Sequence, residues 1–169
     1  MLHAPLFNSA MKSVAPIRKE LGMKTFFNML GPMVNPSSPQ NQIVGVFSLE
    51  LARLYNYIYQ EGNKNYAIIH SLDGYDEISL TDKVKVITNE GEKLYLPEDM
   101  GFNTINPNTI FGGETVADSA AIFVNVIEGK GTREQNEVVI ANAGMALHTI
   151  DNTKPLNLCF ADAQESLMS

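Results

Sequence analysis

An alternation of strand and helix patterns between residues 43 and 70 constrains the fold more than any other feature. The runs IVGVF (Ile43–Phe47) and YAIIH (Tyr66–His70) predict two buried strands. Between them, Ser48 can cap an amphipathic helix, LELARLYNYIYQEG, that ends near Gly62. Such a βαβ unit favours parallel strands with helices on both faces of the sheet. We therefore expect an α/β domain with a mixed, partly parallel sheet flanked by helices.

The sequence after the βαβ unit adds further strand and helix patterns. The runs KVKVIT (Lys83–Thr88) and KLYLP (Lys93–Pro97) flank the turn residues 89–92 and predict an antiparallel hairpin. Helical patterns follow it at Thr115–Glu128, from a capping box of Thr132 and Gln135 to about His148, and from near Pro155 to Met168.

The segment before the βαβ unit combines apolar bulk with tight turns. Asn8 can cap a helix that runs to about Leu21 and is interrupted by Pro16, and residues 24–30 predict a further helical turn or two. Gly31 and Pro32 then end the helical pattern, and residues 35–41 predict a loop. So stiff a segment is either a connector or one wall of a pocket for a flat apolar ligand.

Composition excludes several classes of protein. A chain of 169 residues with 44% hydrophobic side chains can bury one core, so residues 1–169 are expected to form a single domain. The net charge of −7, without a basic run, argues against nucleic-acid binding. Cys159 is the only cysteine, which excludes an internal disulfide and a cysteine-based zinc cluster. The sequence shows neither a membrane span nor a signal peptide, so we expect a cytoplasmic protein.

Two adjacent acids are the clearest candidates for chemistry. Asp76 and Glu77 follow the second strand of the βαβ unit, and α/β sheets bind ligands at the carboxyl ends of their strands. Paired carboxylates in such a loop suit Mg²⁺, which takes one or two of them together with water and phosphate oxygens. The alternative is an Asp-Gly turn followed by solvated acids.

Arg18 is a candidate for binding an acidic small molecule, because its planar guanidinium can hold a carboxylate through two hydrogen bonds. The alternative is a surface arginine paired with a neighbouring acid. The three histidines fit no metal or triad pattern, and no catalytic residue is predicted.

Four stretches of the sequence together resemble the anthranilate phosphoribosyltransferase family of tryptophan biosynthesis. They are APLFNSAMK (4–12), VAPIRKELGMKTFFNMLGPMVNP (14–36), HSLDGYDEIS (70–79) and GGETVADSAAIFVNVIEGKGTREQNEVVIANAGMAL (112–147). The resemblance implies the C-terminal part of a nucleoside phosphorylase/phosphoribosyltransferase-like domain. It also implies transfer of a phosphoribosyl group from phosphoribosyl pyrophosphate to the amine of anthranilate, with Mg²⁺.

The resemblance also assigns residues. It implies that Arg18 binds the anthranilate carboxylate and that Asp76 and Glu77 bind the metal. The anthranilate site would also include Pro5, Asn8, Gly31 and Pro32. Asn8 stands where the family commonly has histidine, so a ligand contact there differs. Lys24 stands where arginine is usual.

The family's phosphate loop, GTGGD, does not occur in this sequence. We therefore expect a fragment of the enzyme that alone is weakly active or inactive, and that forms a homo-oligomer through a strand edge left exposed. Three other readings stay open: a nucleic-acid-binding relative, a nucleoside phosphorylase and a folded fragment without activity.

Overall fold

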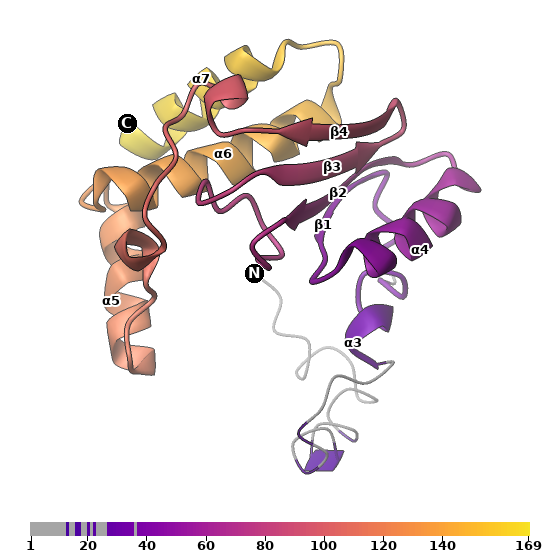
Figure 1. The fold of residues 1–169 in the computed structure, drawn as a ribbon, viewed down its shortest axis with the longest axis horizontal. Coiled ribbons are helices and arrows are strands. Elements are labelled where there is room, and N and C mark those ends of the chain that lie inside the picture. The colour runs from indigo at the N-terminus through magenta and orange to yellow at the C-terminus, as the bar shows by residue number, and fades with distance from the viewer. Residues whose placement is uncertain (1–12, 14–15, 18–19, 21, 23–26, 36) are drawn as a thin grey trace. The chain divides into compact units, whose positions relative to one another are not determined.

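The computed structural model describes residues 13, 16–17, 20, 22, 27–35 and 37–169 (Figure 1). These residues belong to two units, Met1–Ser38 and Pro39–Ser169. In the first unit, α3 (Phe27–Leu30) is a single short helical turn, and Met33 and Val34 both donate backbone hydrogen bonds to the carbonyl of Leu30. The predicted helix from Asn8 to Leu21 lies largely outside the described residues.

The second unit is built on a mixed four-stranded sheet in the order β1-β2-β3-β4 (Figure 1). Its strands are β1 (Asn41–Gly45), β2 (Asn65–Ser71), β3 (Val84–Thr88) and β4 (Gly91–Tyr95). The pair β1 and β2 is parallel, whereas β2 with β3 and β3 with β4 are antiparallel. The predicted fold class, a mixed and partly parallel sheet, is thus confirmed.

Two strands are displaced from their predicted positions by about two residues. β1 starts earlier because Asn41 pairs with Asn65 in the ladder, and the Asn65 side chain also donates to the Asn41 side chain at 2.9 Å. β4 starts earlier because Thr88 pairs directly with Gly91, which leaves a turn of only Asn89 and Glu90. The pairing therefore continues into residues that the sequence pattern assigned to loops.

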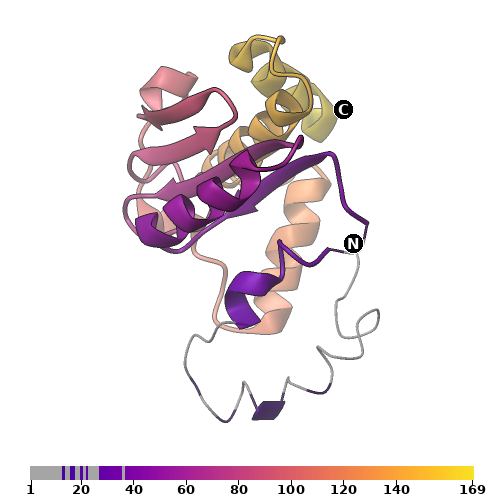
Figure 2. The same ribbon diagram turned by 90° about the vertical axis from the view of Figure 1, so that its right-hand side faces the viewer.

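Helices cover both faces of the sheet (Figure 2). On one face α4 (Leu49–Gln60), capped by Ser48 as predicted, stacks Tyr59 on Tyr66 of β2 with ring centroids 5.3 Å apart. On the other face α6 (Arg133–Ile150) packs against β1 and β2, and α7 (Leu156–Met168) packs on α6. The predicted capping box of Thr132 and Gln135 is present at the start of α6.

The core between the sheet and helices α6 and α7 is apolar. It is formed by the buried residues Ala67, Ile69, Ile78, Leu80, Val84, Val86, Met100, Ile140, Ala141, Met145, Phe160 and Ala163. Two short 3₁₀ helices, Glu98–Met100 and Pro107–Ile110, lead from β4 towards the next helix. No helix in the described part of the chain is long and apolar enough to cross a membrane.

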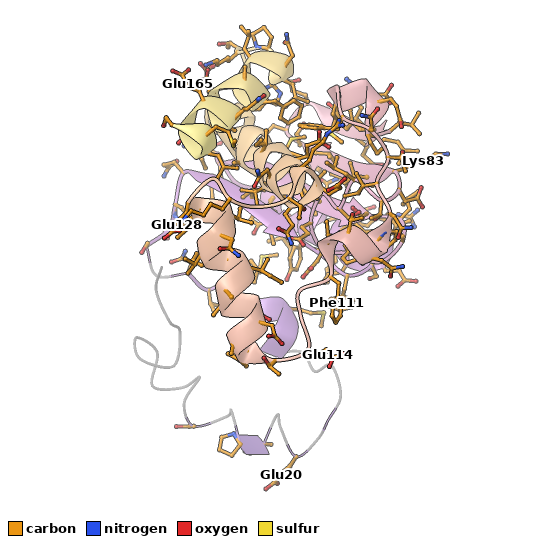
Figure 3. The ribbon with its side chains drawn as sticks, turned by 90° about the vertical axis from the view of Figure 1, so that its left-hand side faces the viewer. Glu20, Lys83, Phe111, Glu114, Glu128 and Glu165 are labelled. Carbon is orange, nitrogen blue, oxygen red and sulfur yellow. The ribbon has the colours of Figure 1, made fainter. Side chains whose placement is uncertain are left out.

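Helix α5 (Val116–Ile127) differs from α4, α6 and α7 because most of its apolar surface faces solvent. Only Val126 is buried, whereas Val116 is 87% exposed and Phe123 is 63% exposed. Phe111 and Glu114 lie near the start of this helix and Glu128 at its end (Figure 3). A folded domain rarely leaves such a surface uncovered, so α5 marks a candidate interaction surface.

Candidate functional site

The predicted acid pair lies in the loop that joins β2 to β3, which we call the acid loop (residues 72–83). The Gly74 amide donates to the Ser71 carbonyl and the Ser71 amide donates to the Tyr75 carbonyl, each at 2.9 Å, so the chain turns tightly at the carboxyl end of β2. Gly74 has a φ of 105°, which favours glycine there. The turn leaves Asp76 and Glu77 exposed at the edge where α/β sheets bind ligands.

The acid loop crosses the end of β1 at Gly45. A β-carbon placed on Gly45 would lie 1.5 Å from the carbonyl oxygen of Asp76 and 2.7 Å from its carbonyl carbon. No side chain fits in that space, so only glycine allows this approach. Gly45 was not among the predicted site residues, although an isolated glycine within a strand pattern is a known sign of close backbone contact.

Two side chains fix the backbone that follows the acid pair. The Ser71 hydroxyl donates to the Glu77 carbonyl at 2.6 Å. The Ile78 amide donates to Oδ1 of Asn142 at 3.0 Å, and Nδ2 of Asn142 donates back to the Ile78 carbonyl at 2.8 Å. The loop is thereby attached to β2 through Ser71 and to α6 through Asn142.

The second part of the acid loop has its own side-chain network. The Thr81 hydroxyl donates to Asp73 and also contacts the Ser79 hydroxyl at 2.7 Å. Leu80, which is buried, has a φ of 60°, a conformation that costs a residue with a side chain free energy. The Leu80 carbonyl accepts a hydrogen bond from the Ile105 amide at 3.0 Å, which helps to hold it there.

The electrostatics of the pair favour a cation. Partial burial of the carboxyl, and next the neighbouring charge of Asp76, raise the pKa of Glu77 above its ordinary value of 4.5. Within the described residues, neither carboxylate takes part in an ion pair with Lys or Arg. A bound divalent cation would relieve this repulsion.

The donor set fits Mg²⁺ better than metals that need a complete protein cage. In the part of the chain that the structure describes, no group of three or more His, Cys, Asp or Glu side chains could hold a metal ion. Asp76 and Glu77 can therefore supply only part of a coordination shell. Mg²⁺ commonly binds in this way, with one or two carboxylates and the remaining positions filled by water and substrate phosphates.

The other predicted residues lie in the first unit. Gly31 and Pro32 form the turn that directly follows α3, where Gly31 is exposed and Pro32 is half-buried. A β-carbon on Gly31 would meet no atom within 4 Å. Pro5, Asn8 and Arg18 lie outside the described residues, so their assignments stay predictions.

The mixed sheet with helices on both faces defines an α/β domain, and the acid loop lies after its parallel strand β2. Residues 1–169 match the sequence model described as "Glycosyl transferase family, a/b domain", and the chain belongs to this family. The resemblance to anthranilate phosphoribosyltransferases is confirmed by sequence relatives. The anthranilate phosphoribosyltransferase of Flavobacterium psychrophilum is 61% identical over 169 residues, which are 100% of this chain and 51% of that protein.

Solved structures show the same fold. The anthranilate phosphoribosyltransferase of Thermus thermophilus superposes with a TM-score of 0.86 at 29% identity, over 99% of this chain and 50% of that one. The Saccharomyces cerevisiae enzyme in complex with PRPP and Mg superposes with a TM-score of 0.85 at 24% identity, over 97% of this chain and 47% of that one. The chain thus spans about half the length of the relatives that it matches.

Proposed function

We propose that this chain is the part of an anthranilate phosphoribosyltransferase that holds the metal and the amine acceptor. The observation that carries the proposal is the exposed Asp76–Glu77 pair in a loop anchored at the carboxyl end of β2, in a chain 61% identical to an enzyme of that name. In the reaction, the amine nitrogen of anthranilate bonds to C1′ of phosphoribosyl pyrophosphate. The C1′–oxygen bond breaks, pyrophosphate leaves, and the amine loses a proton.

Asp76 and Glu77 would hold Mg²⁺, which when bound neutralises charge on the departing pyrophosphate. Arg18 would hold the anthranilate carboxylate through two hydrogen bonds and so orient the amine towards C1′. Pro5, Asn8, Gly31 and Pro32 would line the slot for the aromatic ring. The rigidity of the Gly-Pro turn would reduce the entropy lost on binding.

We further propose that the chain alone is weakly active or inactive, because the GTGGD phosphate loop of the family does not occur in the sequence. The opposing candidate is a folded fragment without a working half-site. A nucleic-acid-binding role is disfavoured by the net charge of −7.

Isothermal titration tests this function. The chain is titrated with anthranilate, then with phosphoribosyl pyrophosphate plus Mg²⁺, and Arg18→Ala serves as the control. Anthranilate heat that disappears in the variant would support an acceptor site in this chain. If neither ligand gave a heat of binding, the result would favour a folded fragment without activity. In a separate assay, turnover at the rate of a full-length enzyme would contradict the expected low activity.

We also propose that the chain forms a homo-oligomer. In the described residues β1 pairs with β2 and stands at the end of the strand order, so it is an edge strand, and Ile43 on it is 37% exposed. Light scattering at rising concentration would test this, since a constant monomer mass would contradict it. The single domain expected for residues 1–169 also stays a prediction, and one cooperative unfolding transition would agree with it.

A further inference from the structure

We propose that Asn142 is a positioning residue for the metal site: from α6 it holds the acid loop in the conformation that presents Asp76 and Glu77 together. The inference rests on the proposed function in taking these two acids as the metal-binding pair. Asn142 itself would not touch the metal. Its role would be to fix the backbone from which the second carboxylate projects.

The hydrogen bonds fix one peptide group from both ends. The peptide that joins Glu77 to Ile78 has its carbonyl bonded to the Ser71 hydroxyl at 2.6 Å and its N–H bonded to Oδ1 of Asn142 at 3.0 Å. Because the two partners stand on opposite sides of this peptide, it cannot rotate without breaking one of the bonds. The orientation of the Glu77 backbone is set accordingly.

The preceding peptide is held as well. The carbonyl of Asp76 lies against Gly45, at a place where a β-carbon would be 1.5 Å from its oxygen. Both peptide groups that flank Glu77 are therefore constrained, one by packing and one by two hydrogen bonds. Together these constraints fix the Cα–Cβ direction of Glu77.

The chemistry of this contact requires an amide. Oδ1 of Asn142 accepts from the Ile78 N–H, while Nδ2 donates to the Ile78 carbonyl at 2.8 Å and to the Val138 carbonyl at 2.9 Å. An aspartate would lack the donors and a leucine would lack every polar group. The bond to Val138, one turn earlier on α6, fixes the side-chain orientation that reaches the loop.

Such preorganisation matters for two like charges. Adjacent carboxylates repel each other, and a free loop would let them separate and would have to be ordered when a cation binds. A loop that is already ordered avoids the entropy cost of ordering on binding. Removing groups that hydrogen-bond to metal ligands and orient them commonly lowers metal affinity by an order of magnitude or more.

The test compares metal affinity with stability in the 169-residue chain. Mn²⁺ is the probe, and its binding is followed by the broadening of amide NMR signals of residues 72–78, with the double variant Asp76→Asn/Glu77→Gln as the reference for the acid pair. Asn142→Ala is expected to weaken Mn²⁺ binding about tenfold and to speed hydrogen exchange at the Ile78 amide. Ser71→Ala, which removes the bond at the other end of the same peptide, is expected to act in the same direction.

Thr132→Ala is the matched control, because it weakens the start of the same helix while its hydroxyl serves the helix cap and not the loop. It should lower stability without changing Mn²⁺ affinity. If Asn142→Ala fails to fold, Ser71→Ala tests the same peptide group. It removes the hydrogen bond at the carbonyl end of that peptide and deletes only one buried oxygen atom.

The outcomes separate the two proposals. Wild-type Mn²⁺ affinity in the folded Asn142→Ala and Ser71→Ala variants would overturn the role of Asn142 and leave the metal site standing. Equal weakening by Thr132→Ala would overturn it too, since a general loss of stability would then suffice. If the unaltered chain bound no Mn²⁺ at Asp76 and Glu77, the metal role in the proposed function would fail, and the positioning role with it.

Discussion

Gly45 and Asp76 are in direct backbone contact although they belong to different elements, and a β-carbon on the glycine would lie 1.5 Å from the Asp76 carbonyl oxygen. This contact joins the end of β1 to the acid loop after β2. The position of the acid loop at the end of the sheet is therefore fixed by β1 as well as by β2.

Gly45→Ala should force the acid loop away from β1. We expect a loss of about 2 kcal/mol in the free energy of unfolding, typical of overpacking where the neighbour is backbone and cannot yield. Denaturant unfolding measures it. Gly62→Ala is the control, because a β-carbon there would meet its nearest atom, the Tyr59 carbonyl oxygen, at an ordinary 3.6 Å. Equal stability of the two variants would contradict the close contact.

Mg²⁺ should raise the thermal unfolding midpoint of the chain, and a chelator should reverse the rise. A cation that binds the folded state alone stabilises it by mass action, and here it also relieves the repulsion between Asp76 and Glu77. The double variant Asp76→Asn/Glu77→Gln should be insensitive to Mg²⁺ over the same concentrations. A midpoint shift of the same size in that variant would place the metal elsewhere.

The start of α5 should loosen in acid. The Asp118 carboxylate accepts from the Thr115 hydroxyl at 2.7 Å and from the Thr115 amide at 3.0 Å, and these bonds lower the pKa of Asp118 below its ordinary 3.8. A depressed carboxyl pKa contributes stability that is complete above the ordinary pKa of 3.8 and is lost as the pH falls through the folded-state pKa.

Asp118→Asn should therefore differ from the unaltered chain in the stability of this helix start at neutral pH, and the difference should disappear as the pH falls through the folded-state pKa, which lies below 3.8. Backbone NMR shifts of residues 116–119, followed from neutral pH downward in both proteins, measure this directly. A difference that stays constant across the titration would show that the ionised carboxylate does not stabilise the helix start.

Thr132→Ala should cost about 1 kcal/mol of stability, the usual effect of removing a helix cap. The Thr132 hydroxyl accepts from the Gln135 amide at 3.2 Å, and the Gln135 side chain accepts from the Thr132 amide at 3.0 Å. Thr132→Ser keeps the hydroxyl and should retain most of the stability. Denaturant unfolding of both variants gives the comparison, and equal losses would argue against the cap.

Local signals in the sequence predict the elements of this fold well. The Ser48 cap and the capping box of Thr132 and Gln135 are confirmed, because their partners lie within one helical turn. Strand ends are less accurate. β4 is displaced because Gly91 pairs with Thr88, and this pairing depends on the neighbouring strand and not on the residue types alone.

The candidate site is divided in the same way. Asp76 and Glu77 lie at the end of β2, as their place after a strand pattern predicts. The residues that anchor them carry no local signal, since Ile78 and Asn142 are separated by 64 positions and meet only when α6 covers the sheet. Gly45 is the exception, because a lone glycine in a strand pattern is visible in the sequence. The roles of Pro5, Asn8, Arg18, Gly31 and Pro32 stay predictions.

Two positions after Asn142 on α6, Gly144 receives the ring of Phe160 from α7, and a β-carbon there would lie 2.3 Å from Phe160 Cδ1. Helix α7 thus packs on the stretch of α6 that is hydrogen-bonded to the acid loop through Asn142. A tag, a cleavage or a crosslink in α7 is for this reason expected to affect α6 as well. A fusion that displaces α7 from α6 would disturb the stretch of α6 that holds the acid loop, without any change near Asp76 and Glu77.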